Sequence, residues 1–254
     1  MELPTTPSFQ LHGRKALVTG AGRGLGLGMA TALAEAGAHT VLLARSEAQI
    51  EEAAAALNAK GLDASFAACD VTDRNAFDHV VADHGPFHVF VNNAGLARHS
   101  KALETSEDDF DAVTNINIKA AYFCAQSIAK SMVTAQIKGS IINISSQMGH
   151  VSGPERAVYS ATKFAVEGFT KGMALEFGPY GIRVNTLCPT FVLTDLTRKT
   201  FENPDLRAMI EAKIALGRVG QLEDMMGPVV FLASDASALM TGSSLLVDGG
   251  WTAA

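Results

Sequence analysis

The sequence predicts one α/β domain spanning residues 1–254: a Rossmann-like, doubly wound parallel sheet of about seven strands with helices on both faces. Strand and helix patterns alternate along the whole chain. The strands are continuous apolar runs, which is typical of strands that helices cover on both faces. No Pro/Gly/Ser-rich linker and no internal repeat divides the chain, and α/β chains of this length often form one domain.

In the first half of the chain, short apolar runs alternate with segments of helical periodicity. The expected strands cover residues 15–19, 40–43, a run ending near 69, and 89–91. The expected helices cover residues 25–36 and 46–60, and a third begins near 72. Gly37 and Gly61 end the first two helices, and Ser46 is expected to cap the start of the second.

The second half continues the alternation. The expected helices cover residues 108–135, 158–177 and about 222–233, and the expected strands cover 140–144, 182–187 and 245–247. Residues 190–217 are polar and irregular, and residues 1–12 are expected to form an N-terminal extension.

Composition and charge narrow the classes of function. The formal net charge is −6, so the sequence lacks the basic footprint of a nucleic-acid binder. The N-terminus does not resemble a signal peptide, and no run approaches the roughly 18 apolar residues of a membrane span. The three cysteines, Cys69, Cys124 and Cys188, have no metal-ligand spacing, so no metal site is expected. Sparse cysteines fit a reducing cytoplasm. The expected binding partners are small molecules and further copies of the chain.

A glycine-rich loop lies where the first strand meets the first helix. Residues 19–26 read TGAGRGLG, in which Gly20, Gly24 and Gly26 let the backbone approach a ligand. The helix N-terminus that follows offers free N–H groups and a positive dipole end, which suit a pyrophosphate. The spacing is not G-x-G-x-x-G, but the context is that of a dinucleotide site. We expect this loop, Arg23 and Leu25 included, to bind a dinucleotide cofactor; a turn without a ligand is the alternative.

The end of the second strand indicates which cofactor fits. Sites for NAD(H) usually place an acidic residue there to bind the ribose 2′-hydroxyl, but this chain has Ala44 and Arg45. Arg45, with Arg23 in the glycine loop, suits a 2′-phosphate, because guanidinium groups match phosphate geometry. NADP(H) is therefore favoured, and NAD(H) stays possible. The alternative is that both arginines are solvated surface residues that bind no cofactor.

Further cofactor contacts are expected at the carboxyl ends of the next strands, where ligands bind in open α/β sheets. Asp70, followed by Val71, is placed to reach the adenine. The small residues around the end of the fourth strand let the backbone lie against the cofactor; they are Asn93, Ala94 and Gly95.

Tyr159 and Lys163 are four residues apart on one expected helix and so share a face. A nearby ammonium favours the phenolate, so Lys163 is expected to lower the pKa of Tyr159. Tyr159 can then serve as the general acid in ketone reduction and as the general base in alcohol oxidation. Ser146, just past a strand, can polarise the substrate carbonyl, with Ser145 as the competing candidate. Asn117 can hold a water that links Lys163 to solvent, or it is a helix-surface asparagine.

Several segments together resemble the short-chain dehydrogenase/reductase family, in the family's order and over nearly the whole chain. They are TGAGRGLG at 19–26, CDV at 69–71, NNAG at 92–95, NINIKA around Asn117, SSQMG at 145–149, YSATK at 159–163, RVNTLCPT at 183–190 and LVDGG at 246–250. The resemblance implies a catalytic tetrad of Asn117, Ser146, Tyr159 and Lys163, and hydride transfer to or from a nicotinamide.

The resemblance also assigns residues to the nicotinamide end of the cofactor. These are Pro189, the Val192 backbone and Thr194, while Lys163 also contacts the nicotinamide ribose. The family's usual Pro-Gly is Pro189-Thr190 in this chain, which leaves the geometry of this loop open.

Polar residues near the expected active site suggest a hydroxylated or carboxylated substrate, although loop-surface positions are the alternative. They are Arg98, His99, Gln147, His150 and Arg156. The leading interpretation is an NAD(P)-dependent oxidoreductase that interconverts a secondary alcohol and a ketone on a sugar, polyol or sugar acid, with residues 190–217 as the substrate lid. The alternatives are a 3-oxoacyl thioester reductase and a non-catalytic dinucleotide-sensing protein. The resemblance further implies a homotetramer.

Overall fold

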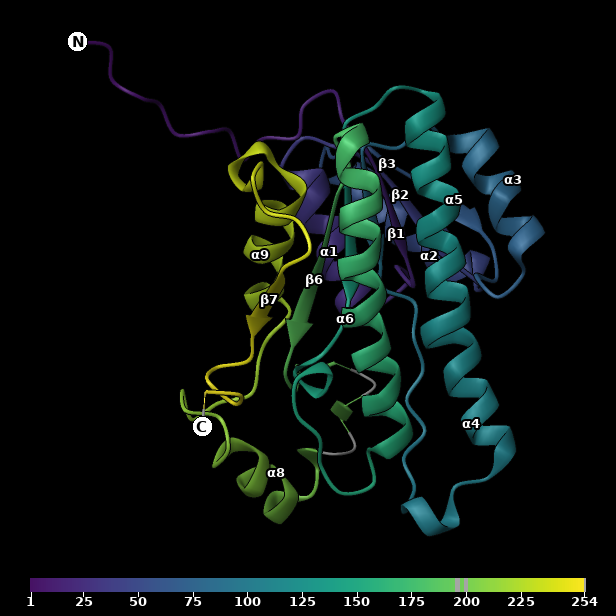
Figure 1. The fold of residues 1–254 in the computed structure, drawn as a ribbon, viewed down its shortest axis with the longest axis vertical. Coiled ribbons are helices and arrows are strands. Elements are labelled where there is room, and N and C mark those ends of the chain that lie inside the picture. Colours follow the sequence, from purple (N-terminus) through teal and green to yellow (C-terminus); the bar gives the residue numbers. More distant parts are fainter. Residues whose placement is uncertain (195–196, 199–200, 254) are drawn as a thin grey trace.

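A computed structural model describes residues 1–194, 197–198 and 201–253. Its centre is a parallel sheet of seven strands, as the sequence predicts (Figure 1). The strand order is β3-β2-β1-β4-β5-β6-β7. The strands are β1 (Lys15–Thr19), β2 (His39–Ala44), β3 (Ala64–Ala68), β4 (Val89–Asn92), β5 (Ser140–Ile144), β6 (Arg183–Pro189) and β7 (Ser244–Val247). The strand order reverses between β1 and β4, which is where open α/β sheets form a ligand crevice.

Helices cover both faces of this sheet (Figure 1). The longer ones are α1 (Gly24–Glu35), α2 (Glu47–Ala59), α3 (Arg74–His84), α4 (Glu107–Thr114), α5 (Ala121–Thr134), α6 (Ala157–Phe177), α8 (Pro204–Glu211) and α9 (Glu223–Ala233). Short 3₁₀ turns lie at Ala102–Glu104, Gln147–Gly149, Gly178–Tyr180 and Asp235–Ser237.

The strand side chains alternate between two hydrophobic cores. Val18 and Leu42 pack with residues of α1, α2 and α9 on one face. Leu17 and Leu43 pack with residues of α3, α5 and α6 on the other. Two cores explain why the inner strands β2, β1, β4, β5 and β6 read as unbroken apolar runs, since almost none of their side chains meets water.

The sequence predicts the strand positions closely but misses details of the helical segments. The expected helix over 108–135 is divided by a π-helical turn at Asn115–Ala120 between α4 and α5. The expected irregular stretch at 190–217 contains α8, while its residues 195–196 and 199–200 lie outside the described part of the chain. Ser46 occupies the N-cap position of α2, but its side chain makes no capping hydrogen bond. In the described residues, no helix is both long and apolar enough to cross a membrane.

Candidate active site

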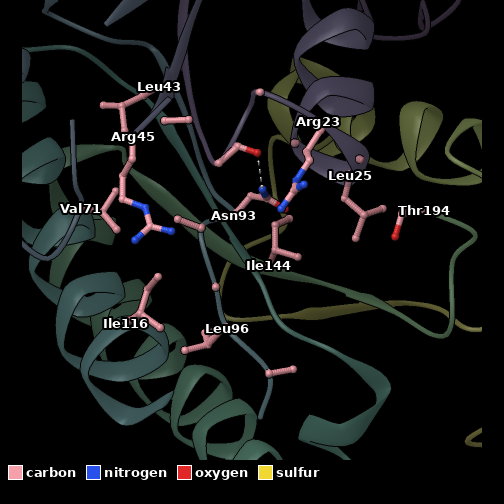
Figure 2. Close-up of a pocket in the computed structure, with 18 of the residues that line it drawn as sticks. Arg23, Leu25, Leu43, Arg45, Val71, Asn93, Leu96, Ile116, Ile144 and Thr194 are labelled. Atoms are coloured by element: carbon pink, nitrogen blue, oxygen red, sulfur yellow. Dashed lines mark hydrogen bonds between the residues drawn. The ribbon is translucent and has the colours of Figure 1, made fainter. Parts of the chain in front are cut away.

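A cavity of about 630 Å³ lies along the carboxyl ends of the strands (Figure 2). Its lining comes from the loops that follow β1 to β6 and from the start of α6. The expected cofactor residues that line it are Gly20, Arg23, Gly24, Leu25, Gly26, Arg45, Asp70, Val71, Asn93, Ala94, Gly95, Tyr159, Lys163, Pro189 and Thr194. Val192 is buried, but it is not among the residues that line the cavity. The lining also includes apolar residues that the sequence did not single out, namely Leu96, Ala97, Ile116 and Ile144.

The glycine loop is held tightly against the loop after β4. Gly20 and Gly24 have φ values of +66° and +55°, a region that favours glycine. A Cβ on Gly26 would lie 2.2 Å from the Gly20 carbonyl oxygen, so no larger residue fits there. The Thr19 hydroxyl oxygen accepts hydrogen bonds from the backbone N–H groups of Asn93 and Ala94, at 2.9 and 3.0 Å. These contacts shape the narrow backbone cradle that a pyrophosphate requires.

The two arginines of the expected 2′-phosphate site both belong to the cavity (Figure 2). The Arg45 side chain is 79% exposed, and its Nη1 lies 3.9 Å from Oδ2 of Asp70. Burial acts to raise the pKa of Asp70, but two hydrogen bonds from Thr72 and the Arg45 charge outweigh it, so the pKa lies below its usual value. The Arg45 guanidinium is therefore exposed at this end of the cavity, where it can bind an anion.

At the other end, Ser146 and Tyr159 come together. The Ser146 hydroxyl donates to Oε1 of Gln147 at 2.7 Å and accepts from the Met148 N–H at 3.1 Å. Burial raises the pKa of Tyr159, while a hydrogen bond with Ser146 and the charge of Arg156 offset part of that rise. The geometry therefore places Ser146 beside the phenol. Its competitor Ser145 has a buried hydroxyl with no hydrogen-bond partner among the described residues.

Lys163 is buried close to the phenol ring of Tyr159. Its Nζ donates to the Ile144 carbonyl oxygen at 2.8 Å and lies 5.6 Å from the centre of the Tyr159 ring. Burial lowers the pKa of Lys163 to about 8, and the nearby Cys188 and Glu167 oppose that fall. Burial thus dominates both groups, and the expectation that the Lys163 ammonium lowers the pKa of Tyr159 stays a prediction.

Asn117 is a buried positioning residue and not a helix-surface asparagine. Its Oδ1 accepts from the Leu96 N–H, and its Nδ2 donates to the Leu96 carbonyl oxygen, both at 2.8 Å. Nδ2 also donates to the Thr162 hydroxyl, on the helix of Tyr159, at 3.1 Å. The amide thus ties the cavity wall after β4 to α6, while its water relay to Lys163 stays a prediction.

The structure separates the expected substrate residues. Arg98 pairs with Asp109 at 2.7 Å, and His150 faces Glu167 and Cys188, so these two side chains are engaged elsewhere. Gln147 contacts Ser146, and Arg156 lies close enough to Tyr159 for its charge to act on the phenol.

One further polar group, His99, lies beside the expected catalytic tyrosine. Its ring meets that of Tyr159 edge-on, with 5.8 Å between the centroids. Burial and the Arg156 charge lower the pKa of His99 to about 4, so it is neutral at pH 7. His99 therefore presents a neutral ring, able to donate and accept hydrogen bonds, next to the phenol.

Thr190 fits its loop without backbone strain. Positive φ angles occur among non-glycine residues at Gln136 and Glu155 but not at Thr190, within the described chain. The threonine therefore meets no steric penalty where the family usually has glycine. Its hydroxyl oxygen is buried without a partner among the described residues, and Thr190 lines the cavity. A ligand in the cavity can supply the missing partner.

Known proteins match this chain over nearly its whole length. The family model described as "Enoyl-(Acyl carrier protein) reductase" matches residues 20–252. The chain is 39% identical to gluconate 5-dehydrogenase of Gluconobacter oxydans (strain 621H) over 96% of each chain. It is 37% identical to D-erythrulose reductase of Gallus gallus, over 96% of this chain and 98% of that protein. The crystal structure of a gluconate 5-dehydrogenase from Burkholderia cenocepacia J2315 in complex with NADP and tartrate superposes with a TM-score of 0.93 at 38% identity, covering 97% of this chain and 98% of that one.

The depressed pKa of Lys163 predicts the pH dependence of carbonyl reduction. The ammonium is present below about pH 8 and is lost as the pH rises through that value, whereas the raised pKa of Tyr159 keeps the phenol protonated there. We expect kcat/KM to fall above about pH 8, because kcat/KM reports the groups of the free enzyme. Cofactor affinity, followed by fluorescence titration, should weaken over the same range. A rate and an affinity that both stay level well above pH 8 would contradict this assignment.

Proposed function

The chain belongs to the short-chain dehydrogenase/reductase family, and from this premise we propose that it is an NADP(H)-favouring oxidoreductase that interconverts a secondary alcohol and a ketone on a sugar, polyol or sugar acid. The observation that carries the proposal is the meeting of Ser146 and Tyr159 at one end of a cavity whose other end holds the glycine loop and Arg45. The substrate class is supported by the relatives, which include a gluconate dehydrogenase and an erythrulose reductase.

The cavity fits a nicotinamide dinucleotide. The glycine loop suits the pyrophosphate, and Arg23 and Arg45 suit a 2′-phosphate at the adenosine end. At the opposite end, the orphaned Thr190 hydroxyl can bond the carboxamide of the nicotinamide. NAD(H) remains a second cofactor, since Asp70 lies near Arg45 and can bond a ribose hydroxyl.

The bound nicotinamide supplies or receives the hydride. Tyr159 gives its phenolic proton to the carbonyl oxygen during reduction and takes the alcohol proton during oxidation. Ser146 donates to the same oxygen once the substrate displaces its bond to Gln147. Arg156 stabilises the phenolate, and Lys163 holds the nicotinamide ribose. The hydride goes to the carbonyl carbon and the proton goes to the carbonyl oxygen. Together they complete the reduction, so no other oxidant or reductant takes part.

Assembly and location extend the proposal. The exposed apolar side chains Phe110, Tyr122, Phe164 and Leu175 on α4 to α6, and Leu246 on β7, support a homotetramer. The three cysteines are free and buried, which suits a reducing cytoplasm.

Replacement of the phenol tests the chemistry. Tyr159→Phe removes the proton but keeps the ring, so turnover should fall by roughly 10²–10⁴-fold while cofactor still binds. Ser146→Ala should lower kcat with a smaller effect on cofactor affinity. Tyr180→Phe is the matched control, because Tyr180 is exposed and lies outside the cavity. Steady-state kinetics with cofactor titration decides the matter, and near-wild-type turnover of Tyr159→Phe would refute the mechanism.

Charge reversal at Arg45 tests the cofactor preference. The unmodified protein should show the higher kcat/KM with NADP(H). Arg45→Asp should shift the NADP(H)-to-NAD(H) ratio by at least tenfold, or about 1.4 kcal/mol, because a carboxylate repels phosphate and can bond a ribose hydroxyl. Lys60→Asp makes the same change of charge at the exposed end of α2, outside the cavity, and should leave the ratio unaltered. A tenfold preference of the unmodified protein for NADH would show the role given to the arginines to be mistaken.

Light scattering tests the assembly. The protein should have the mass of a tetramer at micromolar concentration, because covering exposed apolar side chains with a symmetric partner lowers the free energy. Phe164→Glu on α6 and Leu246→Glu on β7 should each lower the mass, since each places a charge on one of the two apolar surfaces. A monomer for the unmodified protein would rule out this state.

A further inference from the structure

A second cluster of reactive side chains lies one helical turn beyond Lys163, and the proposed reaction does not use it. His150 follows the 3₁₀ turn after Ser146, Glu167 belongs to α6, and Cys188 belongs to β6. The Cys188 Sγ lies 3.2 Å from Oε1 of Glu167 and 3.6 Å from Nε2 of His150, and Nε2 lies 3.6 Å from Oε1. Three groups that can each bind a metal ion thus converge from three segments of the chain.

The spacing of these atoms matches the coordination shell of zinc. Zn–S, Zn–N and Zn–O bonds of about 2.3, 2.0 and 2.0 Å at tetrahedral angles place the ligand atoms about 3.3–3.6 Å apart. The expected edges are about 3.5 Å for S–N and S–O and about 3.3 Å for N–O. The observed separations of 3.6, 3.2 and 3.6 Å each lie within about 0.3 Å of them. Imidazole, thiolate and carboxylate ligands favour Zn²⁺, whereas Mg²⁺ and Ca²⁺ favour oxygen ligands alone. We propose that His150, Glu167 and Cys188 bind one Zn²⁺ ion, with water as the fourth ligand.

The surroundings orient the carboxylate for this role. Oε2 of Glu167 accepts hydrogen bonds from the Thr186 and Ser244 hydroxyls, at 3.0 and 2.6 Å. Those bonds leave Oε1 turned toward the histidine and the cysteine, as partners in an outer coordination shell do. Cys188 is fully buried and the Glu167 side chain is 8% exposed, while the His150 side chain is 28% exposed. The histidine therefore provides the route by which an ion enters from solvent.

The buried hydroxyl of Ser145 borders the cluster. Ser145 is 3% exposed, and its Oγ has no hydrogen-bond partner among the described residues. The hydroxyl faces the Cys188 thiol closely enough to influence it. A Cβ on Gly149 would lie 2.8 Å from Ser145 Oγ and 3.1 Å from Cγ of Glu167, so the hydroxyl borders the cluster across this glycine. A water on the zinc ion can supply the partner that Ser145 lacks.

The site adjoins the cofactor cavity without belonging to it, since none of the three ligands lines that cavity. On binding, the Cys188 S–H bond breaks, an S–Zn bond forms and the proton leaves to solvent, so no oxidant or reductant takes part. The ion ties the segment that carries Ser146 to α6 and β6. The spacing of the cysteines gave no sign of a metal site. The three proposed ligands lie 17 and 21 residues apart in the chain, and only the fold brings them together.

Cobalt substitution in the full-length protein tests the proposal, because Co²⁺ bound by a thiolate absorbs by charge transfer in the near ultraviolet. We expect one tetrahedral Co²⁺ per chain, displaced by Zn²⁺ but not by Mg²⁺. Cys188→Ala should abolish the charge-transfer band, and His150→Gln and Glu167→Gln should each weaken Co²⁺ binding at least tenfold. Cys124→Ala is the matched control, because it removes another buried thiol and should leave the band intact.

Circular dichroism of the metal-free variants shows whether each one folds. Zn²⁺ should raise the Tm of the unmodified protein and of Cys124→Ala, but not the Tm of the three ligand variants. If Cys188→Ala fails to fold, Glu167→Gln decides, since its amide keeps an acceptor for Thr186 and Ser244. The proposal is overturned by a protein that binds no Co²⁺ or Zn²⁺ at micromolar metal, by a band that survives in Cys188→Ala, or by unchanged affinity in Glu167→Gln. None of these measurements depends on turnover.

Discussion

The strands β1, β4, β5 and β6 run parallel, so their carboxyl ends meet at one edge of the sheet, and every part of the site is attached to that edge. Hydrogen bonds across the strand ends make the arrangement rigid. The Thr19 hydroxyl at the end of β1 accepts two N–H groups from the loop after β4. One strand further, Nδ2 of Asn92 donates to Oδ1 of Asn143 on β5 at 2.9 Å. Because these bonds are buried, a displacement of one strand end would leave polar groups unpaired, which costs about 1–3 kcal/mol for each group.

Burial in this edge has opposite effects on the two titrating groups of the site. It raises the pKa of Tyr159 and lowers that of Lys163 to about 8, so both neutral forms gain relative to the charged ones. General acid–base work needs a phenol that can part with its proton, and the charge of Arg156 and the bond with Ser146 act in that direction. The Arg156 charge therefore opposes part of the effect of burial on the phenol.

Local signals in the sequence predict most of the fold, and long-range contacts account for what it misses. Continuous apolar runs bounded by glycine or asparagine mark the strands, and β1 and β5 have the expected bounds. The π-helical turn has no such signal, because the apolar periodicity continues through it while Asn117 bonds to Leu96, a residue 21 positions away. The start of α8 did have a signal: Asn203 caps it and Pro204 occupies its first turn, a pattern that favours a helix start.

The same distinction applies to the site. Motif residues of the glycine loop and of the Tyr159 segment line the cavity because their neighbours in the sequence shape them locally. The positions of the charged side chains expected near the substrate depend instead on ion-pair partners that the sequence spacing does not reveal. Arg98 finds Asp109, and His150 finds a carboxylate 17 residues further along the chain.

Helix α6 shows how far one helical face organises the chemistry. Tyr159, Lys163 and Glu167 follow one another at four-residue intervals, so a phenol, an ammonium and a carboxylate stack along one side of the helix. The phenol and the ammonium line the cavity, whereas Glu167 is buried and takes hydrogen bonds from β6 and from Ser244 of β7. The buried carboxylate raises the pKa of Lys163 against the desolvation that lowers it. A lysine buried without such an anion would lose its charge at a lower pH, and with it the attraction for the ribose and the phenolate. Cys188 and Glu167 therefore help the proposed catalytic lysine keep its charge at neutral pH.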